Sequence, residues 1–285
     1  MYDVRVAVIA DIHHGRDDET KLGSKALSLL DDALAAISGV NPDLLVDLGD
    51  RITDASVEED KRLTREVAKR FIETELPRAH LLGNHDVESL DDAFIEEALA
   101  SPVSHYSKNI GTWSLVFWQA APHYRRGNLR IPESDLGWLA DELRKCSYPT
   151  VIFTHVPLDC GAMDGNYYFE KAPEGRARHY NAETARRIII ESDSVVLVVS
   201  GHAHWNRLNT VDGVHFVTVQ SLTETFTTYP EPAGAWADIR LGESIHVEVR
   251  GRDPIRLVLP IRGKEAHWLT RSAPEDVRTN SRPGV

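Results

Sequence analysis

The sequence is poor in cysteine, and this limits the kinds of site that it can build. Cys146 and Cys160 are its only cysteines among 285 residues. Two thiols are too few for a disulfide framework or for a zinc site made of thiolates. A metal site in this chain would instead draw on oxygen and imidazole ligands, and thirteen histidines are available.

Long apolar runs and an excess of basic residues are also missing. No stretch approaches the ~18 consecutive apolar residues of a membrane-spanning helix, and residues 1–5 lead into a predicted strand without the features of a signal peptide. We therefore expect a soluble cytoplasmic protein that does not contact membranes. The formal net charge of -12 disfavours general nucleic-acid binding, which usually requires a basic face. Small phosphate-bearing substrates stay compatible, because bound metal ions reverse the local field.

The chain has neither internal repeats nor linkers, which predicts one domain. Apolar residues make up 42% of the sequence, enough for a sizeable core. We expect the domain to span 1–262 and a charged tail to follow over 263–285. Within the domain, 158–181 predicts a long polar insert near the site. Its aromatic run, 167–169, either packs the insert onto the body or covers a flat part of a ligand.

The first ninety residues alternate between apolar strands and amphipathic helices. Strands are predicted over 4–10, 43–48 and 78–82, and helices over 20–38 and 57–76. Such units form parallel sheets, in which ligands bind beyond the carboxyl ends of the strands. The polar residues that follow each strand should therefore meet at one edge of the sheet.

The rest of the chain predicts further strands and shorter helices. Strands are expected over 106–107, 113–119, 150–153 and 195–200, and helices over 91–100, 132–143 and 182–190. Four short β segments between 215 and 259 then follow one another closely. This spacing predicts an antiparallel continuation that forms a second sheet on the same core.

Residues with metal-ligating side chains follow five of the predicted strands. They are Asp11 and His13, Asp50, Asn84 and His85, His155, and His202 and His204. In extended backbone, residues i and i+2 point to the same side, so each of the two i, i+2 pairs can face one ion. These oxygen and imidazole groups are more than one tetrahedral zinc can bind, but their number suits two octahedral ions of Mn, Fe, Zn or Co. Asp50 is the natural shared ligand, because a carboxylate has two oxygens. The alternative, five ordinary polar loops, would bring polar groups together at a high desolvation cost.

In their order these motifs resemble those of the calcineurin-like binuclear metallophosphoesterases. The motifs are Asp11-x-His13, Gly49-Asp50, Gly83-Asn84-His85-Asp86, His155 and Gly201-His202-x-His204. The resemblance implies an α/β fold, a four-layer αββα sandwich in which two mixed β-sheets face each other between helices.

The resemblance also implies a role for each motif residue. It makes Asp50 a bridging ligand and His85 a catalytic or phosphate-contacting residue that binds no metal. The other ligands are Asp11, His13 and His204 for the first metal, and Asn84, His155 and His202 for the second. An acidic residue that steadies the histidine is typical where this chain has Thr53. We expect Asp54, one position later, to take that role, and Asp86 is the alternative.

The implied activity is hydrolysis of phosphoric esters by a hydroxide that bridges two metal ions, with Mn, Fe or Zn as the metals. The single domain and the Asn-His-Asp form of the central motif are most similar to the bacterial cyclic-nucleotide-type phosphodiesterases. A phosphodiesterase acting on a small ester is therefore our first expectation. A phosphomonoesterase or nucleotide diphosphatase of the same family is the alternative. A non-catalytic scaffold would have lost ligands, and here none is missing.

Three residues near the motifs are candidates for substrate contacts. Arg51 and His14 adjoin motif residues, and His215 opens a β segment beyond the last motif. Each is also compatible with a purely structural role. The sequence leaves a homo-oligomer open as well.

Overall fold

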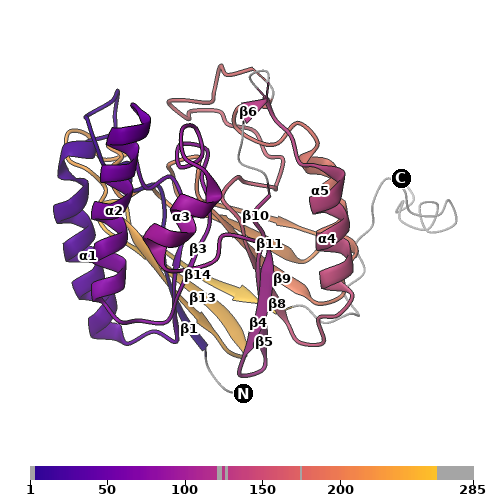
Figure 1. Ribbon diagram of the computed structural model, residues 1–285. Helices are drawn as coiled ribbons and strands as arrows, with labels where there is room; N and C mark the ends of the chain where they lie inside the picture. Colours follow the sequence, from indigo (N-terminus) through magenta and orange to yellow (C-terminus); the bar gives the residue numbers. More distant parts are fainter. Residues whose placement is uncertain (1–3, 121–123, 126–127, 174, 262–285) are drawn as a thin grey trace, which may run out of the picture.

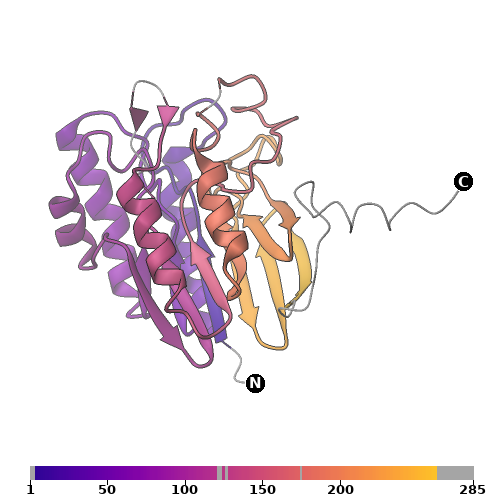
Figure 2. The ribbon, with the colours of Figure 1, turned by 90° about the vertical axis from the view of Figure 1, so that its right-hand side faces the viewer.

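Two mixed β-sheets of six strands face each other, and helices cover their outer faces (Figures 1 and 2). The computed structural model describes residues 4–120, 124–125, 128–173 and 175–261; the tail expected over 263–285 lies outside them. The four-layer αββα fold implied by the resemblance is confirmed.

The first sheet has the strand order β14-β13-β12-β1-β2-β3. Its strands are β1 (Val4–Ile9), β2 (Leu44–Asp47), β3 (Arg78–His80), β12 (Trp236–Leu241), β13 (Ser244–Arg250) and β14 (Ile255–Pro260). β1, β2 and β3 run parallel, and β12 pairs antiparallel with the free edge of β1. The helices α1 (Ala26–Val40), α2 (Val57–Glu73) and α3 (Asp92–Leu99) lie on this side of the molecule (Figure 1).

The second sheet has the order β10-β11-β9-β8-β5-β4. Its strands are β4 (Tyr106–Ile110), β5 (Trp113–Phe117), β8 (Thr150–Phe153), β9 (Val195–Ser200), β10 (Arg207–Val211) and β11 (Val214–Thr218). The four central strands are parallel, and both edge strands are antiparallel. The helices α4 (Glu133–Leu143) and α5 (Ala182–Glu191) cover the outer face, and a short hairpin joins β6 (Tyr124–Arg125) to β7 (Asn128–Leu129).

The sequence predicts that the late β segments continue the chain as an antiparallel second sheet. The antiparallel pairing is confirmed for β12, β13 and β14, but the prediction that these segments form a second sheet is wrong. β12, β13 and β14 extend the first sheet beyond β1, whereas β11 joins the second sheet. The reason is that β1 is apolar on both faces and lies inside a sheet, so both of its edges need a partner. Alternate residues of β1 confirm its double burial: Val6 and Val8 pack between the sheets, and Ala7 and Ile9 pack against the helices.

The helix expected over 20–38 begins later than predicted. Its first regular turn is a 3₁₀ turn at Gly23–Lys25, and α1 starts at Ala26. Residues 18–22 are held instead in a turn that pairs with the segment around Glu224. This turn brings Lys21 next to the site described below.

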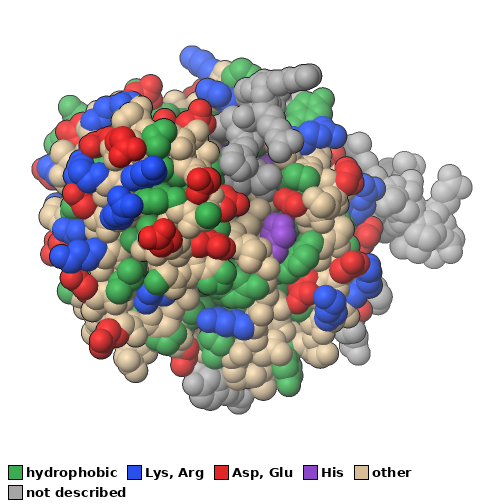
Figure 3. Space-filling view, in the orientation of Figure 1, with side chains coloured by type: hydrophobic (Ala, Val, Ile, Leu, Met, Phe, Trp, Pro, Cys, Tyr) green, Lys and Arg blue, Asp and Glu red, His purple; other side chains and the backbone are tan. Residues whose placement is uncertain are grey.

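Two expectations about the surface can be compared with the fold. Among the described residues, no helix is long and apolar enough to cross a membrane. On the face shown in Figure 3, lysine and arginine side chains are interspersed with acidic ones, unlike the continuous basic face typical of nucleic-acid binders. The cytoplasmic location and the oligomeric state stay predictions.

Candidate metal centre

The loops that carry the five motifs meet where strands of the two sheets end. Those loops follow β1, β2 and β3 in the first sheet, and β8 and β9 in the second. All seven expected ligands are buried, and Asn84 is the most exposed of them at 6%. The seven are Asp11, His13, Asp50, Asn84, His155, His202 and His204. Polar groups so deeply buried need partners, because their desolvation is otherwise uncompensated.

The prediction from the i, i+2 spacing requires an extended backbone at these ligands. The structure differs, because the backbone there is not extended. Asp11, His13, Asp50, His202 and His204 all have φ between 48° and 65°, in the left-handed region. Few residues other than glycine adopt this region, and such strain clusters at functional sites. Both members of each i, i+2 pair therefore reach the site because of left-handed turns, and not because side chains alternate along a strand.

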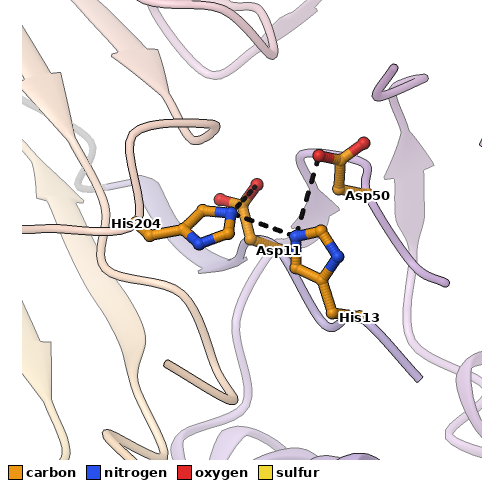
Figure 4. A group of neighbouring side chains, drawn as sticks. All are labelled: Asp11, His13, Asp50 and His204. Carbon is orange, nitrogen blue, oxygen red and sulfur yellow. Dashed lines mark hydrogen bonds and ion pairs between the residues drawn. The ribbon is translucent and has the colours of Figure 1, made fainter. Parts of the chain in front are cut away.

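Asp11, His13, Asp50 and His204 form the first group of candidate ligands (Figure 4). One ligand atom from each of them lies within 4.8 Å of all the others. The Nε2 atoms of His13 and His204 are 3.0 Å apart, and His204 Nε2 is 3.6 Å from Asp11 Oδ1. His13 Nε2 is 3.8 Å from Asp50 Oδ2. Four donors from three loops thus converge on one point.

A second group shares Asp50 with the first. It contains Asp50, His155 and His202, again with ligand atoms within 4.8 Å of one another. His155 Nε2 is 3.3 Å from Asp50 Oδ2, the same oxygen that faces His13. Asn84 lines the same pocket. Asp50 therefore lies between the two groups, where a bridging carboxylate is required.

Hydrogen bonds on the outer side of the imidazoles fix which nitrogen faces the centre. His155 Nδ1 donates to Leu48 O and His204 Nδ1 donates to Glu224 Oε2, both at 2.9 Å. His202 Nε2 donates to the carbonyl oxygen of Arg176, also at 2.9 Å. Metal-binding histidines use this arrangement, because a donated outer N–H leaves the other nitrogen with a lone pair to offer.

The donor atoms that face the centre suit metal ions. His155 Nε2 and Asn84 Oδ1 are buried and have no hydrogen-bond partner among the described residues, although His155 Nε2 lies 3.3 Å from Asp50 Oδ2. A neutral His155 whose Nδ1 carries the proton would direct a lone pair at the carboxylate of Asp50, which is repulsive unless a cation lies between them. The donor set of carboxylate, imidazole and amide suits divalent transition metals.

Charge compensation in the centre is visible in the pKa values. Burial would raise the pKa of Asp50, but His155 and His85 hold it well below its usual value. Burial would lower the pKa of His155, and the charge of Asp50 raises it to about 9. Burial lowers the pKa of His202 to about 3. Metal binding would displace the protons that compensate these carboxylates.

His85 is placed beside the centre and not within either group of ligands. Its Nδ1 is hydrogen-bonded to Asp54 Oδ1, its ring lies 4.9 Å from that of His13, and its side chain is 29% exposed. Burial would lower its pKa, but Asp50 and Asp54 raise it above the usual value. Asp86 accepts the backbone N–H groups of Asp50 and Gly83 at 2.9 and 2.8 Å. Of the two carboxylates that the sequence left open, Asp54 is therefore the one that contacts His85.

The three expected substrate contacts lie elsewhere, and none of them lines the pocket. His14 Nε2 is 2.8 Å from Glu66, and His215 is hydrogen-bonded to Thr210 and to the carbonyl oxygen of Pro260. Arg51 is fully buried. Because these side chains already have partners away from the centre, we no longer assign them to the substrate.

Arg51 instead holds two motif loops together. Its Nε lies 2.6 Å from Asp47, and its two terminal nitrogens donate to Asp86 at 2.9 Å and to Leu81 O at 2.5 Å. Asp47 also accepts from His80 Nδ1 at 2.9 Å. The loop after β2 is thus fixed against the loop after β3, which positions Asp50 relative to Asn84.

Replacement of Arg51 by methionine should strongly destabilise the protein. The variant leaves Asp47 and Asp86 buried without their counter-ion, and loss of one partner from a buried ion pair typically costs about 3–5 kcal/mol. We expect urea unfolding of the metal-free protein to show a loss of this size. Arg62→Met is the control, since Arg62 is half exposed on α2 and its ion pairs within the described part of the chain are with Glu59 and Glu66. Equal stability losses in the two variants would contradict the prediction.

Two residues at the site were missed in the sequence. Glu224 is fully buried and holds His204, and Lys21 lines the pocket although only 5% of it is exposed. A signal for Glu224 was present, because the run 220–225, polar except for Leu222, follows β11 as the motifs follow their strands. Lys21 lies in the stretch predicted as a helix, so its place at the pocket could not be predicted.

The centre opens into a pocket of about 740 Å³, which the insert helps to line. Tyr167, Tyr168 and Phe169 form one wall. The ring of Phe169 stacks on His202 with centroids 5.1 Å apart, and Tyr168 meets His204 edge-on at 5.3 Å. The aromatic run therefore packs onto the centre and also faces the space next to it.

This fold and this pair of ligand groups define a class, the dinuclear metal-dependent hydrolases of phosphoric esters. The chain belongs to the calcineurin-like phosphoesterases, whose family model matches residues 4–206. A comparison with curated protein sequences gives no match.

Solved structures share the fold at low sequence identity. A dimetal phosphatase from Danio rerio has a TM-score of 0.74 at 16% identity, covering 91% of this chain and 99% of that one. A purple acid phosphatase from yellow lupin (Lupinus luteus) has a TM-score of 0.60 at 13% identity, covering 96% and 57%. GAP50, the anchor in the inner membrane complex of Plasmodium, has a TM-score of 0.59 at 14% identity, covering 93% and 90%.

Proposed function

We propose that this protein is a phosphodiesterase that hydrolyses a small phosphoric ester with two metal ions, Mn, Fe or Zn, at the centre described above. The observation that carries the proposal is the shared carboxylate. Asp50 Oδ2 lies 3.8 Å from His13 Nε2 and 3.3 Å from His155 Nε2, so one oxygen faces both groups of ligands.

The proposed ligands follow from these two groups. Asp50 would be common to both ions. The first ion would also be held by Asp11, His13 and His204, and the second by Asn84, His155 and His202. When bound, such a pair supplies Lewis acidity and lowers the pKa of water to near neutrality.

His85 and Asp54 would act on the substrate from the side of the pocket. Since Nδ1 of His85 is engaged by Asp54, its Nε2 is left to donate a hydrogen bond to a phosphoryl oxygen or a proton to the leaving oxygen. The backbone N–H of His85 donates to Asp50 Oδ1 at 2.8 Å, and this bond fixes the backbone position of His85 relative to the proposed bridging carboxylate. His85 would thus be the catalytic residue and Asp54 its positioning residue.

The preference for a diester rests on the chemistry of the pocket wall. A diester carries an organic group on both sides of phosphorus. The aromatic side chains at 167–169 and a volume of about 740 Å³ offer such a group both surface and room.

Two other functions have specific observations behind them. The Danio rerio and lupin relatives are phosphatases by name, which favours a phosphomonoesterase or nucleotide diphosphatase as the second candidate. GAP50 is named as an anchor, so a non-catalytic scaffold is the third candidate. The complete set of buried ligands argues against the scaffold.

A turnover panel with the metal-reconstituted protein tests the proposal. With Mn²⁺ bound, we expect kcat/KM for bis-p-nitrophenyl phosphate to exceed that for p-nitrophenyl phosphate by roughly two- to tenfold. This is the effect of one additional aromatic contact of ~0.5–1.5 kcal/mol. Cyclic nucleotides and glycerophosphodiesters extend the panel. Equal rates on monoesters and diesters would contradict the diesterase, and two bound metals without any turnover would favour the scaffold.

A further inference from the structure

Lys21 lines the same pocket as His85 and His204, and the activity described so far does not use it. We propose that Lys21 is a substrate-binding residue whose ammonium group contacts an anionic oxygen of the phosphate group beside the metal centre. The inference rests on the proposed function, because it takes a phosphoric ester as the ligand.

The backbone at Lys21 is fixed on two sides. It exchanges both backbone hydrogen bonds with Asp18, at 2.9 and 3.0 Å, which closes a tight turn. Lys21 also forms a β-bridge with Glu224, and the next residue, Leu22, donates to the carbonyl oxygen of Thr223 at 3.0 Å. Because Glu224 holds His204, the position of Lys21 is tied directly to a candidate metal ligand.

The side chain of Lys21 is buried at the edge of the pocket. Only 6% of the side chain is exposed. Lysine is almost never buried to this degree unless it has a partner. Its Nζ lies 3.1 Å from Asp18 Oδ2 and 5.4 Å from the ring centroid of Tyr168. The same ring meets His204 edge-on at 5.3 Å, and its hydroxyl is 2.6 Å from Thr20 Oγ1. The lysine stem and Tyr168 thus form one rigid wall beside the centre.

The ammonium group of Lys21 lies in the same pocket as residues of the centre. That pocket is also lined by Asp50, His85 and His204. A phosphate group bound there would bring its anionic oxygens close to Lys21, and lysine is a common point-charge ligand for phosphate.

The competing explanation is an ion pair that only closes the turn between Asp18 and Lys21. Two features argue against it. Asp18 is 37% exposed, so a lysine directed to solvent could pair with it equally well without losing its hydration. An ammonium group also has three donors, and a site beside the pocket leaves a donor for an anion. The two explanations differ in what removal of the Asp18 charge should do.

Binding of inorganic phosphate to the Mn²⁺-loaded protein tests the inference. We expect Lys21→Met to weaken phosphate binding in calorimetry by about 10- to 100-fold, the range for a charge-assisted hydrogen bond. The KM for the diester should rise similarly with little change in kcat, and Lys21→Arg should recover most of the affinity. Asp18→Asn and Lys25→Met, the latter an exposed lysine outside the pocket, should stay within about twofold of the wild type.

The outcomes separate the inference from the proposed function. Unchanged phosphate affinity in Lys21→Met, or an equal loss in Asp18→Asn, overturns the inference while ester turnover by the wild type still stands. Wild-type protein that binds phosphate but hydrolyses no ester refutes the proposed function instead. If Lys21→Met does not fold or bind metal, Lys21→Gln takes its place, because its amide keeps a hydrogen-bond donor and removes only the charge.

Discussion

Replacement of Asp50 by asparagine is expected to abolish hydrolysis and to release metal. Asp50 is 1% exposed, and its Oδ2 faces ligands of both groups, so the substitution removes one negative charge from both ion sites at once. Lewis-acid stabilisation by bound metal is worth several kcal/mol. Since each ~1.4 kcal/mol changes a rate tenfold, a loss of about 4 kcal/mol corresponds to a fall of about 10³-fold in kcat.

Metal content and turnover should be measured on the same preparation. Asparagine keeps the size of the side chain and an oxygen in place of Oδ1, which accepts the N–H of His85 at 2.8 Å, so we expect the variant to fold. Glu88→Gln is the matched control: Glu88 is an exposed carboxylate that lines the same pocket, and its amide should leave both measurements unchanged. An Asp50→Asn protein with full metal content and full rate would remove Asp50 from the centre.

Much of the centre could be predicted because of how parallel strands converge. Asp11, Asp50 and Asn84 each follow an apolar run, and the carboxyl ends of parallel strands share one edge. The sequence therefore indicated which residues would meet. It gave a wrong backbone geometry for them, because an i, i+2 spacing does not reveal that Asp11 and His13 have left-handed φ values of 51° and 48°.

Side-chain directions and partners distant in the chain could not be predicted from the sequence. Arg51 adjoins Asp50 in the chain, but the direction of its side chain is set by the buried charges of Asp47 and Asp86. Glu224 lies twenty residues from the histidine that it holds, at a distance that no motif spacing encodes. The position of β12 depended on the unpaired edge of β1, a property of the assembled sheet.

The choice between Asp54 and Asp86 shows the same limit at a single residue. Both carboxylates lie within a few positions of a motif, and neither position says which one reaches His85. In the fold, Asp86 accepts backbone N–H groups from two loops and a guanidinium N–H of Arg51, so it serves the scaffold of the site. Asp54, which follows Asp50 by four residues, contacts His85.

Replacement of His85 by alanine is expected to lower kcat by about 10²- to 10⁴-fold, the range typical of general acid–base catalysis, and to leave metal content unchanged. The two expectations belong together because His85 lies beside the centre and outside both groups of converging ligand atoms. Asp54→Asn should have a smaller effect, since the amide oxygen still accepts a hydrogen bond from His85 Nδ1.

The control for this prediction is His14→Ala. His14 adjoins a candidate ligand in the chain, but its ring is directed to Glu66 at 2.8 Å, so its removal should change neither rate nor metal content. Metal analysis separates the possible roles of His85: a His85→Ala protein that has lost metal would make His85 a ligand, and one with an unchanged rate would leave proton donation to another group. A large rate loss at full metal content would place His85 on the substrate, because a residue that neither holds metal nor supports the fold can act on the rate only through the reacting ester.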